Sequence, residues 1–341
     1  MDGRKTRRAP ASAPPARAKA GRLKLPASVV RAAQAANRLA SSKLARTLVT
    51  VAILAIAAVL IHGELQSARL SDITRVIAAT PPWALGLSVV FTVAAYLSEA
   101  VIEGCALKLI GKPLPIGRTV LAASASSALS IAMGFGLASG TAARLRFYAF
   151  AQLSAADAAK VTALVSGPLF LSGMIVLGLS GFGGLETIGA ILHWPIWGVA
   201  AMSLALLAPL PAWFLVLRRR RGHDGEALGA RGRTAALAGG IGGWLFQGAA
   251  MFVLSARHLS DFPGFLAAFC LGSLLGSAFG VPADLGVLEA AVLGSHALGP
   301  AHQTAAALLL YRLIFQLIPL ILATAAMSLR QMVKLARPAR S

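Results

Sequence analysis

The sequence predicts an all-α integral membrane protein with about six full membrane spans and two re-entrant broken hairpins. Three observations lead to this fold class: an apolar composition, apolar segments of about 20 residues, and basic residues gathered at the ends of those segments. Apolar residues make up 57% of the 341-residue chain and charged residues 13%, with a mean hydropathy of +0.73. Soluble domains carry about 25% charged and about 45–50% apolar residues, so a soluble enzyme is excluded.

The net charge of +20 is a second constraint on the class of protein. A nucleic-acid-binding domain spreads its basic residues along a folded face with interleaved aromatic residues. Here Lys and Arg concentrate in residues 1–46 and beside apolar segments, which is the pattern of the positive-inside rule. We therefore expect a multi-pass protein of a bacterial inner (plasma) membrane with cytoplasmic N and C termini, and no nucleic-acid partner.

The chain divides into three parts. Residues 1–46 are rich in Ala, Arg, Pro and Ser, which predicts a disordered basic cytoplasmic tail near anionic headgroups; an organellar transit peptide would have a similar composition. Residues 47–328 form the predicted polytopic transmembrane domain, and 329–341 a short basic cytoplasmic tail. The apolar segments lie at 44–62, 83–107, 115–139, 160–182, 196–217, 235–256, 263–281, 284–298 and 303–328.

Two regions fit the charge pattern only if each crosses the membrane twice or not at all. Residues 115–147 are interrupted by Gly134-Phe-Gly136 and by Gly140, and residues 263–298 by Gly280-Val-Pro282 and by Gly286. Broken backbone at membrane depth is tolerated only where protein buries it or where it lines a water-filled cavity. We therefore predict that both regions are re-entrant hairpins. The stretch 181–194, which has no Lys or Arg, is predicted to be an outer loop.

The two hairpin regions have matching surroundings. Each follows a span that contains a tryptophan, Trp83 or Trp244, and each precedes another span. The single extra span 196–217 between the copies would invert the second copy relative to the first. Inverted repeats with paired discontinuous helices indicate a transporter site near the membrane midplane.

Five charged residues are predicted to lie at membrane depth: Glu99, Glu103, Asp284, Glu289 and Arg312. A charge at membrane depth costs about 2.5–3.5 kcal/mol on insertion scales, so each needs a partner or a function. Glu99 and Glu103 are four residues apart and share one helix face, although Glu103 could also reach water at the helix end. Arg312 is too deep for that, and Glu289 or Asp284 is its natural partner; a structural ion pair and a substrate contact both remain open.

Arg144 and Arg146 follow the first hairpin. One interpretation is that they obey the positive-inside rule as cytoplasmic residues. In the other, Arg144 faces a phosphate that enters from the cytoplasmic leaflet, because a guanidinium binds two oxygens at once and stays charged.

The usual catalytic and metal-binding patterns are missing from the sequence. There is no HExxH, CxxC, Walker or Ser-His-Asp arrangement, and Cys105 and Cys270 stand singly in apolar surroundings. We therefore expect no catalytic residue, no metal and no cofactor, and we do not expect an enzyme.

Four strings in order resemble a known family. They are Leu109-Ile-Gly-Lys-Pro-Leu-Pro115, Gly140-Thr-Ala-Ala-Arg-Leu-Arg-Phe-Tyr148 followed by Leu153-Ser-Ala, Asp284-Leu-Gly-Val-Leu-Glu289, and Leu310-Tyr-Arg-Leu-Ile-Phe with Leu-Ile-Pro319. From about 45 to 328 the chain resembles the transmembrane (flippase) region of the lysyl-phosphatidylglycerol synthase/flippase family, the multiple peptide resistance factors. It departs from the family at Ser130-Ile-Ala-Met, where an Asn is expected, and at Glu103, where the family tends to have Asp.

The resemblance implies that the chain corresponds to the half of such a protein that moves lipid, because residues 328–341 leave no room for the cytosolic synthase domain. The expected function is a flippase that moves an aminoacylated or related phospholipid between leaflets. Arg144 and Arg312 would bind its phosphate, and Glu99, Glu103 and Glu289 its ammonium groups. Two alternatives are a membrane anchor for a separate synthase subunit and a transporter of another lipid or ion. The expected partners are membrane phospholipid, such a synthase subunit and a second copy of the chain.

Overall fold

The computed structural model describes residues 76–134, 136–148, 153–211, 229–255, 258–295 and 301–325. Every regular element in this part of the chain is a helix, and six of the helices are long and apolar enough to cross a membrane. The predicted all-α membrane class is confirmed at this level. The predicted span 44–62 and both predicted tails lie outside the described residues.

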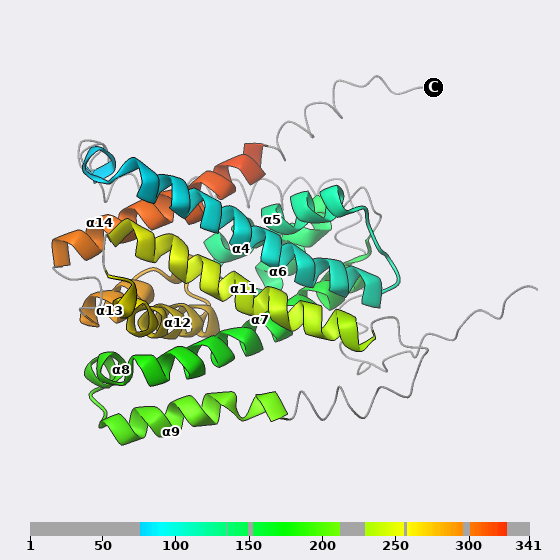
Figure 1. Cartoon of the computed structure of the whole chain (residues 1–341). Coiled ribbons are helices and arrows are strands. Elements are labelled where there is room, and N and C mark those ends of the chain that lie inside the picture. The colour runs from blue at the N-terminus through cyan, green and yellow to red at the C-terminus, as the bar shows by residue number, and fades with distance from the viewer. Residues whose placement is uncertain are drawn as a thin grey trace, which may run out of the picture.

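The helices form one bundle, in which long helices lie side by side (Figure 1). In chain order they are α4 (Pro82–Leu109), α5 (Ile116–Met133), α6 (Gly136–Phe147), α7 (Ala155–Gly183), α8 (Leu185–Leu192), α9 (Ile196–Leu207), α11 (Ala230–Phe252), η2 (Val253–Ser255), η3 (Leu259–Asp261), α12 (Phe262–Phe279), η4 (Pro282–Asp284), α13 (Val287–Gly294), α14 (Ala301–Tyr311) and η5 (Arg312–Leu317). The order of a long helix, two helices joined at a break, and a long helix therefore occurs twice, as α4 to α7 and as α11 to η5.

Helix α4 shows how the sequence sets one membrane span. Its first residue is Pro82, whose fixed φ suits the first helical position, and it ends before Gly111, which has a φ of +74°. Its 28 residues are about 42 Å long at the usual rise. The outer face exposes large apolar side chains at the helical spacing of Val90, Val93, Leu97 and Val101. This face is suited to lipid.

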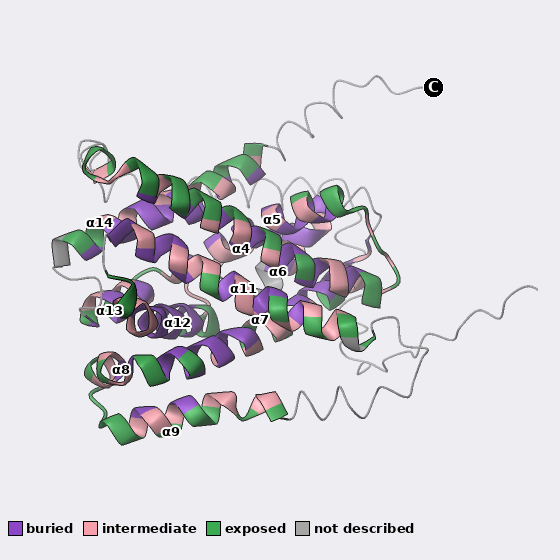
Figure 2. Cartoon of the chain, in the orientation of Figure 1, coloured by how far each residue is buried: buried purple, intermediate pink, exposed green. Residues whose placement is uncertain are grey.

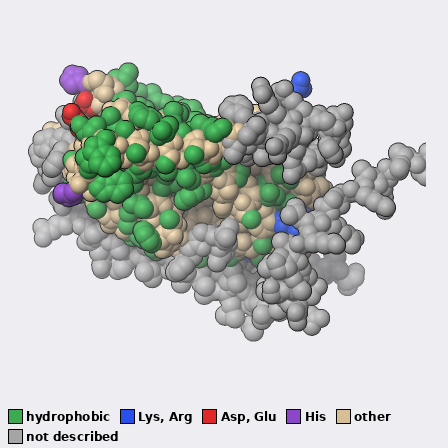
Figure 3. Space-filling view, turned by 90° about the horizontal axis from the view of Figure 1, so that it is seen from below, with side chains coloured by type: hydrophobic (Ala, Val, Ile, Leu, Met, Phe, Trp, Pro, Cys, Tyr) green, Lys and Arg blue, Asp and Glu red, His purple; other side chains and the backbone are tan. Residues whose placement is uncertain are grey.

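The bundle buries its inner helices and exposes apolar side chains to its surroundings. Helix α12 is buried along most of its length (Figure 2). Figure 3 shows that apolar side chains cover much of the described surface seen from below, and that charged and His side chains lie only near its two ends. An apolar belt between two polar ends is the surface expected of a protein in a bilayer.

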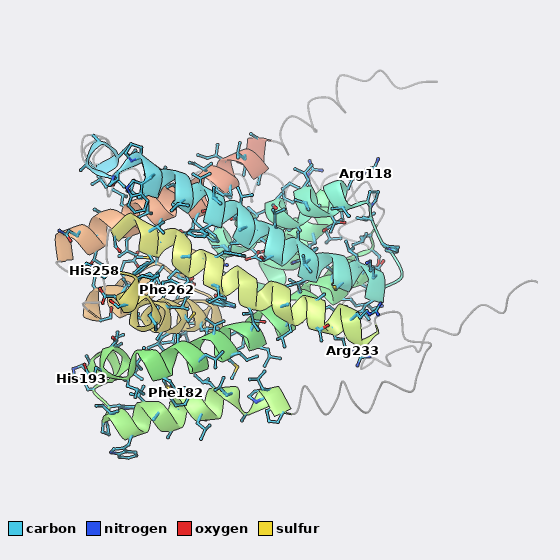
Figure 4. All side chains as sticks on the ribbon, in the orientation of Figure 1. Arg118, Phe182, His193, Arg233, His258 and Phe262 are labelled. Atoms are coloured by element: carbon cyan, nitrogen blue, oxygen red, sulfur yellow. The ribbon has the colours of Figure 1, made fainter. Side chains whose placement is uncertain are left out.

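The two ends of the bundle differ in charge. Figure 4 places Arg118 and Arg233 at one end, and His193 and His258 at the other. The described Lys and Arg other than Arg312 all lie on the helix ends and connections near Arg118 and Arg233; they are Lys108, Lys112, Arg118, Arg144, Arg146, Lys160, Arg231 and Arg233.

Two predictions for the middle of the chain need correction. The stretch 181–194 is not a loop, because α7 continues to Gly183 and α8 follows until His193 ends it in the left-handed conformation. Helices α8 and Ile196–Pro211 meet at an angle of 104°. Helix α7 starts at Ala155 rather than at 160, because Ser154 and Asp157 form a capping box that satisfies free N–H groups of the first turn. Of the predicted span 196–217, the structure describes the part up to 211.

Both predicted helix interruptions are present. Helix α5 ends at Gly134, with a φ of +70°, and α12 ends at Gly280, with a φ of +68°; glycine adopts this left-handed conformation without steric cost. The second glycines of the two regions differ, however. Gly286 has a φ of +80° and precedes α13, whereas Gly140 lies within α6 and does not interrupt it.

The two breaks touch each other. Arg118 in the first turn of α5 lies at one end of the bundle and Phe262 at the start of α12 lies toward the other side (Figure 4), and the C-terminal ends of the two helices meet. A Cβ added to Gly134 would lie 2.4 Å from the Pro282 nitrogen. A Cβ on Gly280 would lie 3.3 Å from the Gly134 carbonyl oxygen. Backbone packs directly on backbone at this contact, which we call the break contact.

The break contact predicts that one methyl group added at Gly134 lowers the stability of the protein. Gly134→Ala should destabilise the protein by about 2–5 kcal/mol, because it adds left-handed strain and a steric overlap with Pro282. The measurement is the thermal unfolding midpoint of the purified protein in detergent. Gly167→Ala is the matched control, since no atom lies within 4 Å of the new Cβ, and alanine favours the helix by about 1 kcal/mol. Equal midpoints for the two variants would contradict the contact.

Candidate functional site

The first buried charge pair joins Glu103 of α4 to Arg144 of α6. Arg144 Nε donates to Glu103 Oε1 at 2.7 Å, and Arg144 Nη2 donates to Glu103 Oε2 at 2.6 Å. The two residues are 1% and 4% exposed, respectively. This is the two-pronged geometry that makes arginine–carboxylate pairs strong and directional. Glu103 therefore does not reach water at the helix end, and Arg144 is not simply a surface residue.

Two further groups fix the Arg144 side chain. Its Nη1 donates to Thr162 Oγ1 of α7 at 3.3 Å and to the Gly140 carbonyl at 3.4 Å. Gly140 is needed for packing, because a Cβ there would lie 3.0 Å from both Arg144 Nη1 and Thr162 Cγ2. The glycine that the sequence predicted as a helix break thus makes room for the arginine. We call Glu103–Arg144 the first ion pair.

Glu99 lies one helical turn before Glu103 and is 4% exposed. Its Oε1 accepts a hydrogen bond from Gln247 Nε2 of α11 at 3.1 Å, and the Ser127 hydroxyl of α5 also donates to its carboxylate. Both donors are neutral. The predicted shared face of Glu99 and Glu103 is confirmed, but only Glu103 is joined to an arginine by an ion pair among the described residues.

The second ion pair joins Glu289 of α13 to Arg312 of η5. Arg312 is 7% exposed, and Glu289 Oε2 also accepts from the Gly286 backbone N–H at 2.6 Å. Of the two partners expected for Arg312, Glu289 forms the ion pair. Arg312 begins a π-helical turn, a rare geometry that occurs frequently at functional sites.

Asp284 is held beside this pair by an unusual backbone. Ala283 and Asp284 both have positive φ, 52° and 54°, which is uncommon for residues with a side chain. The Ser273 hydroxyl donates to the Asp284 carboxylate, and the side chain packs so closely on Gly276 that a Cβ there would lie 2.4 Å from Asp284 Oδ1. Gln316 Nε2 donates to the Ala283 carbonyl at 3.4 Å.

An aromatic cluster of Tyr96, Tyr311 and Phe315 joins α4 to the last helix. The rings of Tyr311 and Phe315 stack with centroids 5.1 Å apart, and Tyr96 stacks on Phe315 at 5.3 Å. The Tyr96 hydroxyl also donates to the Phe315 carbonyl at 3.0 Å. Tyr311 is within electrostatic range of both Glu99 and Asp284, so this group connects the two halves of the site.

Sequence reasoning missed Tyr96, Tyr311 and Gln247. The first two lie within three residues of Glu99 and Arg312, so their sequence neighbourhood was the available signal. Gln247 is a single amide in an apolar segment, and nothing in the sequence pairs it with α4. Arg146, which the sequence included in the site, is partly exposed and lies two residues after Arg144. Positions i and i+2 do not face each other on a helix, so α6 directs the two arginines differently.

The candidate site contains no metal-binding arrangement within the described residues: no group of three or more His, Cys, Asp or Glu side chains there could hold a metal ion. Its chemistry consists of carboxylates, guanidinium groups, hydroxyls and two side-chain amides, Gln247 and Gln316. Such groups can bind ionic headgroups, small ions or protons.

Six helices of membrane-crossing length, an apolar outer surface and charges paired inside the bundle define the class of this protein: it is a multi-pass α-helical membrane protein. No family model matches the chain. It is similar to a protein of Synechocystis sp. described as uncharacterized, with 28% identity over 231 residues, which cover 63% of this chain and 69% of the relative.

The first ion pair predicts strong coupling between its members. Glu103→Ala and Arg144→Ala should each destabilise the protein by about 3–5 kcal/mol, because each leaves a buried charge without its partner. The double variant should lose much less than the sum, as measured by unfolding of all three variants in detergent. The control is Lys112→Ala, which removes the partly exposed pair with Asp157 at 2.8 Å, with side chains 38% and 20% exposed, and should cost about 0–1 kcal/mol. Additive losses at Glu103 and Arg144 would contradict the paired geometry.

Proposed function

We propose that this protein is a lipid transporter that moves an aminoacylated or related phospholipid between the leaflets of a bacterial inner membrane. The observation that carries the proposal is the break contact: the C-terminal ends of two interrupted helices meet at their glycine breaks, and the short helix that follows each break holds one partner of an ion pair. Transporters commonly place their substrate sites between paired discontinuous helices of this kind.

We propose that the two broken regions are re-entrant hairpins that belong to an inverted repeat. Helices α6 and α13 contain 12 and 8 residues and are about 18 and 12 Å long, short of the hydrocarbon core of about 30 Å. Each would return toward the end from which α5 or α12 started. The end that carries Arg118 and Arg233 would be cytoplasmic, in agreement with the positive-inside rule.

The headgroup class follows from the chemistry of the ion pairs. A headgroup with both a phosphate and an ammonium can replace both partners of a carboxylate–arginine pair at once: the phosphate takes the guanidinium and the ammonium takes the carboxylate. No buried charge is then left alone, which is the outcome that makes breaking such a pair costly. A purely anionic headgroup would bind the arginine in place of the carboxylate, and the carboxylate would then have no partner.

Aminoacylated phosphatidylglycerol meets this requirement, since its lysyl form carries one phosphate and two ammonium groups. The resemblance of the residues around Arg144, Glu289 and Arg312 to the lysyl-phosphatidylglycerol flippase region supports the same lipid class. In this proposal Glu103 and Glu289 exchange their arginines for the ammonium groups, while Arg144 and Arg312 take up the phosphate as the lipid passes.

The proposal predicts that the second ion pair is needed for lipid movement. In proteoliposomes that contain fluorescent lysyl-phosphatidylglycerol, Glu289→Gln and Arg312→Ala should slow movement between leaflets at least about tenfold, because an interaction of about 1.4 kcal/mol or more is lost. Lys112→Ala, which breaks the exposed pair with Asp157, should retain the wild-type rate.

Lipid movement at the rate of empty liposomes would overturn the proposal, as would equal rates in all variants. The same assay with phosphatidylglycerol tests the headgroup class: a purely anionic lipid should move more slowly than the aminoacylated one. If it moves equally fast, the two-partner exchange is wrong. Thermal unfolding of each variant shows whether a slow rate comes from loss of folded protein.

A further inference from the structure

The two halves of the site share an imbalance of charge. Among the described residues, each half contains one arginine and two carboxylates, and the ion pair joins the arginine to one of these two carboxylates. Glu99 in the first half and Asp284 in the second are joined by no ion pair among the described residues; we call them the two spare carboxylates. If both were ionised, each half would carry one net negative charge inside the bundle.

The surroundings of Glu99 supply neutral donors and little compensating charge. Its direct hydrogen-bond donors are the Gln247 amide and the Ser127 hydroxyl. The charged groups near it are Glu103 on its own helix and Arg144 on α6, and those two already neutralise each other. The remaining titratable neighbours are two phenols, Tyr96 on the same helix and Tyr311 on α14, which both interact electrostatically with Glu99.

Asp284 has an equivalent environment. The Ser273 hydroxyl of α12 is its neutral donor, and Glu289 and Arg312, its charged neighbours on α13 and η5, are joined in the second ion pair. Tyr311 of α14 is its titratable neighbour. From α5, which packs against η4, the nearest group is the uncharged Gly134 backbone.

These environments select a proton over a metal ion. A sodium or calcium ion needs several oxygen ligands around it, and among the described residues no group of three or more His, Cys, Asp or Glu side chains could hold one. A proton needs a single carboxylate oxygen and removes the uncompensated charge completely. Carboxylates of this kind inside membrane proteins commonly serve in proton relays.

We propose that Glu99 and Asp284 are proton-binding sites that couple lipid transport to a proton gradient. The binding step is the addition of one H⁺ to each carboxylate to give a carboxylic acid, with no other bond made or broken. A lysyl headgroup has a net positive charge, so it competes with the protons for the same interior negative charge. Lipid and protons therefore occupy the site in turn, which is proton–lipid exchange: lipid moves outward as protons move inward.

As a coupling step, this inference rests on the proposed lipid transport, but the proton sites can be tested without any lipid. Dicyclohexylcarbodiimide reacts with protonated carboxylic acids in apolar surroundings and leaves a stable N-acylurea that mass spectrometry locates. In the purified full-length protein, Glu99 and Asp284 should be labelled, and the labelling should decrease as the pH is raised. Glu103 and Glu289 are the internal controls and should be labelled at least about tenfold less, because an arginine occupies each of these carboxylates in an ion pair.

The labelling result decides the proton sites. Glu99→Gln and Asp284→Asn should each lose only their own label, which shows that the other site remains folded and accessible. Equal labelling of paired and spare carboxylates would overturn the inference, and so would absence of label on both spare carboxylates at low pH.

The coupling is tested in proteoliposomes with lysyl-phosphatidylglycerol and an imposed pH gradient. The steady-state ratio of lipid between leaflets should change about tenfold per pH unit for each proton exchanged. This response should decrease in Glu99→Gln and in Asp284→Asn and persist in Lys112→Ala. Labelling without any lipid movement would refute the transport proposal alone, whereas gradient-independent lipid movement by the wild type would refute the coupling alone.

Discussion

The break contact is the feature on which the rest of the site depends. At Gly134 and Gly280 the helices α5 and α12 end inside the bundle, and without water each free backbone group would be costly. Packing one break on the other covers backbone of Gly134 with Pro282 and Gly280, while Phe279 beside the break is 78% exposed. The same arrangement brings the C-terminal ends of two helices together and lets α6 and α13 begin close by. It thereby sets where Arg144 and Glu289, carried by those short helices, can lie.

The two ion pairs connect the broken elements to the continuous helices. Arg144 joins α6 to α4 through Glu103, and Glu289 joins α13 to the last helix through Arg312. In each case one partner lies on a short helix that follows a break and the other on a long helix. Because removal of either charge is expensive in an apolar interior, the pairs hold the short helices in place. A substrate that offers both charges can loosen this connection and leave neither residue unpaired, which joins the stability of the fold to its proposed transport.

The spare carboxylates give the described part of the site more acidic than basic groups. A bundle that needed only structural ion pairs would contain equal numbers of buried acidic and basic groups, because each additional charge at membrane depth costs free energy. In the part of the chain that the structure describes, Glu99 and Asp284 exceed that number by one in each half. Asp284 is also held in a backbone conformation that residues with side chains rarely adopt. Strain and excess charge at the same position are features that a purely structural role does not require.

The sequence by itself determined the membrane class, most helix positions, both glycine interruptions and the residues that carry buried charge. These follow from local properties: apolar length, glycine's access to positive φ, and the cost of a charge in lipid. Only the tertiary structure decided that Arg144 belongs to Glu103, that Gly140 provides packing space and not a break, and that Gln247 reaches Glu99 from another helix. These facts depend on distances between segments far apart in the chain, and no local pattern encodes which face of one helix meets which face of another.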